Sequence, residues 1–194
     1  WTFGIGHTAA ADLPDPAQMS RGMPADLDVG IREAFRLFRI DIVAYEAEVL
    51  RAVKVPLEPH EFDALVSFHY NTGGIAKASL TRHLNTGNRA AATQGFMGWL
   101  RPAAIRTRRE AERDLFRDGR YPTGTIPVWA VDRNGRVDFS RPIRRMTETE
   151  ALTLLRPTGQ PVPPTVPLPE PTESPGSPSW WQRLVEFLTG KATS

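Results

Sequence analysis

The chain has 194 residues, 40% of them hydrophobic, and a formal net charge of +2 at pH 7. This length and hydrophobic content suffice for one core with appendages and argue against a second full domain. Because the chain contains no Cys, disulfides, thiol catalysis and thiolate metal sites are excluded, while the compartment stays open. Its sequence has no run of about 18 apolar residues, so no membrane-spanning helix is predicted.

Basic residues are concentrated in the middle of the chain. Residues 101–145 contain twelve Arg and six acidic residues. One interpretation is a face for an anionic polymer, and the other, which we favour, is an ordinary solvated charged surface. Nucleic acid is not an expected partner, because the segment has no recognisable binding motif and the chain is close to neutral.

The first thirty residues are rich in Gly, Pro and Asp, which predicts a short strand or hairpin followed by a long loop. Apolar residues then recur at steps of three and four, which predicts a long amphipathic helix over 29–53. Asp28 is its expected N-cap, and Pro56 ends it.

Four shorter helices and a hairpin are predicted after the long helix. The helical patterns cover 59–71, 79–84, 89–100 and 106–117. Residues 126–131 and 137–139 have the alternating pattern of strands and flank Asn134-Gly135, a strong hairpin signal. One last helical turn or two is expected over 147–155.

The C-terminal part of the sequence changes character again. Residues 157–179 hold nine of the eighteen prolines and predict a linker that is partly polyproline II. Residues 180–190 follow, where Trp181, Leu184 and Leu188 share one face of a predicted helix. Membrane contact through this helix is an alternative that we do not favour over docking or self-association, because a basic polar face is nearly absent.

Three blocks of the sequence resemble the phage-type lysozymes of glycoside hydrolase family 24. Thr2-Phe3-Gly4-Ile5-Gly6-His7 is similar to the family's Thr-Ile-Gly-x-Gly-His core. The second block runs from Val55-Pro56-Leu57 through Phe62-Asp63-Ala64-Leu65-Val66-Ser67-Phe68 to Tyr70, Asn71 and Gly73, and the third contains Trp99, Arg106, Arg109 and Glu112. The blocks occur in family order and together cover residues 1–118.

The resemblance implies a mainly α fold of the α+β lysozyme-like class, with a helical lobe and a small N-terminal β element. Residues 1–118 are expected to form the lysozyme-like domain, and 119–156 a β-hairpin extension packed on it. The linker 157–179 and the amphipathic Trp-rich helix 180–190 complete the predicted organisation. No cofactor and no metal are expected, and His60, His69 and His83 are too scattered for a zinc site.

The resemblance also implies the catalytic roles. Thr2 corresponds to the family's threonine, whose hydroxyl helps to hold the attacking water, while an Asp activates this water and a Glu protonates the leaving oxygen. Counted back from Thr2, both carboxylates fall before residue 1. We therefore expect a chain truncated before its catalytic Glu and inactive as given, since threonine has no useful basicity at neutral pH. Asp12, Asp15 and Glu33 are poor substitutes, because nothing in the sequence predicts the burial that a general acid needs.

The other expected site residues support the loop or bind substrate. The family pairs its motif His with an Asp, here His7 with Asp41, and this pair would brace the loop and raise the pKa of the imidazole. Tyr70 and Asn71 match positions that line the sugar cleft, with helix capping as an equal alternative for Asn71. Arg106 is the better arginine for substrate binding, since Arg109 is expected to pair with Glu112 as ordinary helix-surface electrostatics.

These residues predict a peptidoglycan muramidase, an endolysin that hydrolyses the β-1,4 bond between N-acetylmuramic acid and N-acetylglucosamine and lyses the host cell. Its partner would be the peptidoglycan glycan strand. The enzyme would be made in the host cytoplasm and act on the cell wall in the periplasm. The alternative is a non-catalytic peptidoglycan-binding or structural prophage remnant.

Overall fold

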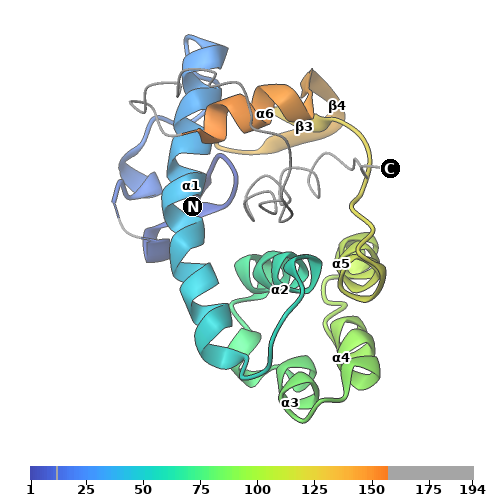
Figure 1. Ribbon diagram of the computed structural model, residues 1–194. Coiled ribbons are helices and arrows are strands. Elements are labelled where there is room, and N and C mark those ends of the chain that lie inside the picture. Colours follow the sequence, from blue (N-terminus) through green and yellow to red (C-terminus); the bar gives the residue numbers. More distant parts are fainter. Residues whose placement is uncertain (12, 157–194) are drawn as a thin grey trace, which may run out of the picture.

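The computed structural model describes residues 1–11 and 13–156. Asp12, the predicted linker 157–179 and the predicted helix 180–190 lie outside these residues. A long helix, α1 (Leu27–Ala52), runs along one side, and α2 (Pro59–Thr72) lies between it and α5 (Arg106–Asp118) (Figure 1). The mainly α fold class predicted from the sequence is confirmed.

Helix α1 begins slightly earlier than its sequence predicted. Its N-cap is Asp26, whose extended backbone lets the carboxylate accept a hydrogen bond from the Val29 amide at 3.0 Å. The prediction of Asp28 as the cap was therefore wrong. Asp28 lies in the first helical turn, where an acidic residue favours the helix dipole, and its carboxylate pairs with Arg144.

The helices after α1 follow the predicted order, with one difference. Helix α3 spans Ser79–Asn85 and α4 spans Arg89–Gly95. The predicted helix over 89–100 is too long, because α4 ends at Gly95 and a 3-10 turn, Phe96–Gly98, follows. Two glycines within four residues weaken a regular helix at this point. Further 3-10 turns cover Ala9–Ala11, Pro16–Gln18, Ile75–Lys77 and Ala103–Ile105.

The core lies where α2 meets the surrounding helices. Ala64, Leu65, Val66 and Phe68 have no exposed surface, as the nearly continuous apolar face of α2 predicted. The Phe68 ring makes edge contacts with Phe96 and Trp99. Helix α2 therefore provides the base on which the functional residues of its C-terminal half are held.

The C-terminal half of the described chain contains a hairpin and a last helix. Strands β3 (Ile126–Val131) and β4 (Val137–Met146) pair antiparallel across the predicted Asn134-Gly135 turn. Strand β4 is longer than the predicted 137–139, because register shifts near Val128–Ala130 interrupt the alternating pattern and the pairing resumes beyond them.

Helix α6 (Glu148–Leu155) packs on α1 after this hairpin. Met146, Ala151 and Leu155 are buried and belong to the same hydrophobic core as α1 and α2. The capping box of Thr147 and Glu150 fixes the start of the helix. Among the described residues, no helix is both long enough and apolar enough to cross a membrane.

Candidate active site

The loop that carries Thr2 is a miniature hairpin. Strand β1 (Thr2–Phe3) pairs with β2 (His7–Thr8), so that Thr2 lies opposite Thr8. Gly4 and Gly6 have φ values of 54° and 101°, which side chains rarely adopt. A Cβ on Gly4 would lie 2.5 Å from the Ala34 Cβ atom, so glycine lets the loop approach α1. Thr2 is exposed.

His7 fastens this loop to α1. Its Nδ1 atom lies 2.8 Å from Oδ2 of Asp41, and its Nε2 atom lies 2.8 Å from the carbonyl oxygen of Pro14. Both residues are buried: His7 is 2% exposed and Asp41 is 5% exposed. Burial alone lowers the pKa of His7, but the Pro14 carbonyl and Asp41 outweigh it and raise the pKa above its ordinary value. Both nitrogens face acceptors, which the doubly protonated imidazolium satisfies.

Tyr70 fastens the same loop to α2. Its hydroxyl donates a hydrogen bond of 2.7 Å to the carbonyl of Ile5, and its ring packs against Gly6. Edge contacts with Phe38 and Tyr45 hold the ring, and burial raises the pKa of its hydroxyl. The phenol group thus already has an intramolecular partner, and its predicted contact with sugar stays a prediction.

Asn71, the next residue, is exposed and lies at the edge of a buried ionic cluster. Its side-chain oxygen accepts a hydrogen bond from Arg109, which also pairs with Glu112. The alternative that Asn71 caps its helix is wrong, because α2 continues to Thr72 and its C-cap is Gly73. The expected Arg109–Glu112 pair is present, but its assignment to the helix surface is wrong, because both side chains are completely buried.

Two further residues of this cluster were missed by the sequence analysis. Ser67 donates a hydrogen bond of 2.8 Å to Glu112, and Arg108 donates one of 2.9 Å to the same carboxylate oxygen. Burial raises the pKa of Glu112, and the two arginines oppose this shift. The Ser67 position within the second sequence block and the Arg108-Arg109 pair were the available signals, but only the folded chain shows that they converge.

Arg106 differs from its buried neighbours. Its side chain is 60% exposed and lies 3.6 Å from Glu110 in an ion pair one helical turn away. Exposed pairs of this kind contribute little to stability, so the guanidinium is free to exchange Glu110 for another anion. Its predicted role in substrate binding is compatible with this exposure and stays a prediction.

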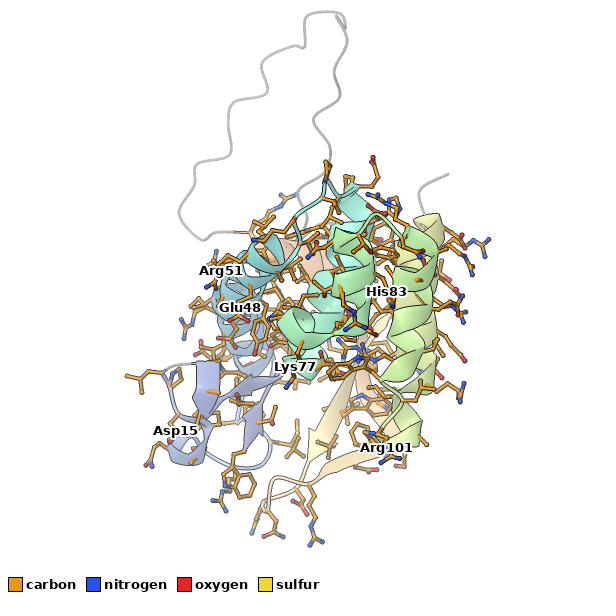
Figure 2. The ribbon with its side chains drawn as sticks, turned by 90° about the horizontal axis from the view of Figure 1, so that it is seen from below. Asp15, Glu48, Arg51, Lys77, His83 and Arg101 are labelled. Carbon is orange, nitrogen blue, oxygen red and sulfur yellow. The ribbon has the colours of Figure 1, made fainter. Side chains whose placement is uncertain are left out.

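The acids that were considered as substitutes for the family's carboxylates have structural partners. Asp15, at the side of the small hairpin in Figure 2, caps a 3-10 turn through the Ala17 amide. Glu33 binds Arg36 at 2.7 Å, and this hydrogen bond lowers the pKa of the carboxyl group. Asp12 lies outside the described residues. A carboxyl group that the sequence did not single out, Glu46, has a pKa raised to about 7 by burial and by the nearby charge of Asp63.

The residues of this site have separate roles. An exposed threonine lies on a loop that is attached to α1 through His7 and to α2 through Tyr70. Such a group can orient a water molecule or a hydroxyl, but acid–base work requires carboxyl groups or an imidazole with an available nitrogen. In the part of the chain that the structure describes, no group of three or more His, Asp or Glu side chains is placed to hold a metal ion.

The sequence comparisons agree on one family. The sequence model described as phage lysozyme matches residues 1–112. The endolysin of Salmonella phage P22 is 31% identical over 121 residues, which is 59% of this chain and 78% of that protein. The endolysin of Bacillus phage B103 is 38% identical over 126 residues, 61% of this chain but only 44% of that protein. A solved endolysin of Escherichia coli O157:H7 phage FAHEc1 aligns over 48% of this chain and 66% of its own, with 27% identity and a TM-score of 0.45.

Proposed function

The chain belongs to the phage lysozyme family of glycoside hydrolases, and from this membership we propose that it acts as a peptidoglycan muramidase in host cell lysis. The substrate is the β-1,4 bond between N-acetylmuramic acid and N-acetylglucosamine, and the place of action is the bacterial cell wall. The observation that carries the proposal is the Thr2 loop, with its two positive-φ glycines and its buried His7–Asp41 tie of 2.8 Å.

Within this reaction, Thr2 orients the water that attacks the anomeric carbon. Thr2 is exposed on a loop that is held at two points. This favours the role, because a residue that is already fixed in place can hold a water molecule in the geometry that the reaction needs. Asn71, fixed by Arg109, presents an amide nitrogen suited to sugar hydroxyl or N-acetyl oxygens. Arg106 offers an exposed positive charge for the substrate.

Hydrolysis also needs two carboxyl groups of unequal pKa on opposite sides of the sugar. In the family pattern a Glu and an Asp that precede the threonine supply these groups. We propose that residues 1–194 supply the water-orienting and substrate-positioning part of the site, and that hydrolysis requires a segment carrying the two carboxylates.

The test compares the 194-residue chain with the same chain extended by a segment that carries a Glu and an Asp at the family spacing. Reducing ends released from purified peptidoglycan and loss of turbidity of permeabilised bacteria are measured for both. The extended chain is expected to hydrolyse and the shorter one only to bind. Hydrolysis by the shorter chain would overturn the need for the extra carboxylates, whereas binding without hydrolysis by either favours a non-catalytic remnant.

A substitution in the extended chain tests Thr2 itself. Thr2→Val keeps the shape and removes the hydroxyl, so we expect kcat to fall by about a hundredfold with an unchanged melting temperature. Thr8→Val is the matched control, because Thr8 lies directly opposite Thr2 in the same hairpin. Equal activity of both variants would refute the assigned role.

A further inference from the structure

The β3–β4 hairpin has one face that the proposed hydrolytic site does not use. Val137, Phe139, Arg141, Ile143 and Arg145 of β4 are exposed, although register shifts near Trp129 interrupt the regular alternation, and we call these five side chains together with Trp129 the outer face. Phe139 is 70% exposed, and its ring makes an edge contact with Trp129 at 5.4 Å. Figure 2 shows the hairpin projecting beyond the helical body at the lower edge of the view.

The opposite face of the hairpin accounts for its attachment. Met146 is buried in the core, and Arg144 pairs with Glu150 at 2.9 Å and with Asp28. At the turn, a Cβ on Gly135 would lie 2.6 Å from the Trp1 ring, and the Val131 amide lies 3.2 Å from the Met23 sulfur. The hairpin is therefore held on the domain at both ends, and its outer face is left without a covering element among the described residues.

The hairpin is positively charged, and two of its arginines belong to the outer face. Residues 131–146 contain five Arg and two Asp. Of the five, Arg141 and Arg145 lie on the outer face and form no ion pair with any described residue. The two acids are engaged in turns, because Asp132 accepts hydrogen bonds from the Asn134 and Arg136 amides and Asp138 accepts one from the Ser140 amide. The exposed arginines are thus available to an anionic partner.

We propose that the outer face binds the surface of an anionic lipid bilayer. Three exposed apolar side chains, Val137, Phe139 and Ile143, gain free energy only in an apolar phase, which a hydrated polyanion does not offer. An aromatic ring at the boundary and arginines that reach phosphate groups are typical of interfacial binding. A second copy of the chain fits less well, because a symmetric contact would bring two copies of the same positively charged face together.

The test measures co-sedimentation of the full 194-residue chain with vesicles of pure phosphatidylcholine and of equal parts phosphatidylcholine and phosphatidylglycerol. We expect binding to the anionic vesicles only. The Phe139→Ser/Ile143→Ser variant should reduce the partition coefficient by at least about tenfold, since two exposed apolar groups lose their burial. The Arg141→Gln/Arg145→Gln variant should reduce it by about thirtyfold at low salt and much less in 0.5 M NaCl.

Matched controls separate this face from other parts of the chain. Arg32→Gln/Arg82→Gln removes two exposed arginines elsewhere and should leave binding unchanged. A Trp180→Ser/Trp181→Ser variant tests the predicted C-terminal helix. The proposal is overturned if both hairpin variants bind like the wild type, if only the tryptophan variant loses binding, or if the chain binds a soluble polyphosphate but no vesicle. Unchanged melting temperatures confirm that the variants remain folded.

Discussion

Two buried ionic groups, the His7–Asp41 pair and the cluster around Glu112, join very different parts of the described chain. The His7–Asp41 pair ties a loop with strands of two residues to α1. The cluster of Ser67, Arg108, Arg109 and Glu112 joins α2 to α5, which also pack through a large apolar core. The loop packs on the core through Ile5 and is otherwise positioned by polar contacts, whereas the polar cluster lies between two helices that share the apolar core.

The largest effect on stability is expected at the helix cluster. Glu112→Ala leaves the fully buried Arg109 without its carboxylate, and removing one partner of a buried pair costs about 3–5 kcal/mol. In denaturant unfolding, this loss should appear as a lower midpoint concentration of denaturant. Glu110→Ala, which removes only the exposed partner of Arg106, is the control and should change stability by less than about 0.5 kcal/mol. A similar loss of stability in both variants would contradict the explanation that burial causes the effect of Glu112→Ala.

The His7–Asp41 pair should contribute less to the free energy of unfolding than the helix cluster, and its contribution should depend on pH. Asp41→Asn removes the partner of His7, and we expect a loss of about 2 kcal/mol, less than for Glu112 because the imidazole can release its proton. The pKa of His7 is raised in the folded state, so the stability that Asp41 contributes is fully present below about pH 6.5 and is lost as the pH rises through the folded pKa.

Unfolding of both proteins at pH 5 and pH 9 tests this sign. The difference between wild type and Asp41→Asn should be larger at pH 5. A difference that is equal or larger at pH 9 would show that the pair is not an ion pair with a protonated histidine.

Local patterns in the sequence predicted most of the helices and the hairpin turn. They did not predict all the polar contacts, because these join residues that are far apart in the sequence. The periodicity over 29–53 and the Asn134-Gly135 signal were sufficient because each reports a local conformation. Arg109 was assigned to the surface because its Glu112 partner is three residues away, a spacing typical of exposed pairs. Its contacts with Asn71 and with the Phe68 ring come from another helix, 38 and 41 residues earlier, and no local pattern contains that information.

Glu46 is an intermediate case, a half-buried carboxyl group on α1 that forms no ion pair with any described residue. Its pKa is raised to about 7, first by burial and then by the charge of Asp63. The folded state therefore binds more protons than the unfolded state between about pH 4.5 and 7, and stability falls as the pH rises through this range. Glu46→Gln should stabilise the protein by about 1–2 kcal/mol at pH 8, a discounted value since the group is partly solvated, and by almost nothing at pH 4.

Thermal unfolding at the two pH values measures the effect of Glu46→Gln. Glu48→Gln is a neighbouring control on the same helix, with an exposed carboxylate that binds His69 at 2.7 Å. The control should not stabilise the protein at pH 8. A stabilisation by both variants would indicate a general charge effect on α1 instead of the local burial of Glu46.

The smallest expected effect is at the second tie of the loop. Tyr70→Phe removes the hydroxyl that donates to Ile5 at 2.7 Å and keeps the ring that packs against Phe38 and Tyr45, so the global loss should be about 1 kcal/mol. Because the loop has few other contacts, its local opening should increase more than the global unfolding. Hydrogen exchange of the Phe3 and Thr8 amides, compared with that of the α2 core around Leu65, separates the two. Faster exchange in the loop alone would show that Tyr70 positions the Thr2 loop, whereas equal acceleration at both places would mean that the hydroxyl only stabilises the fold.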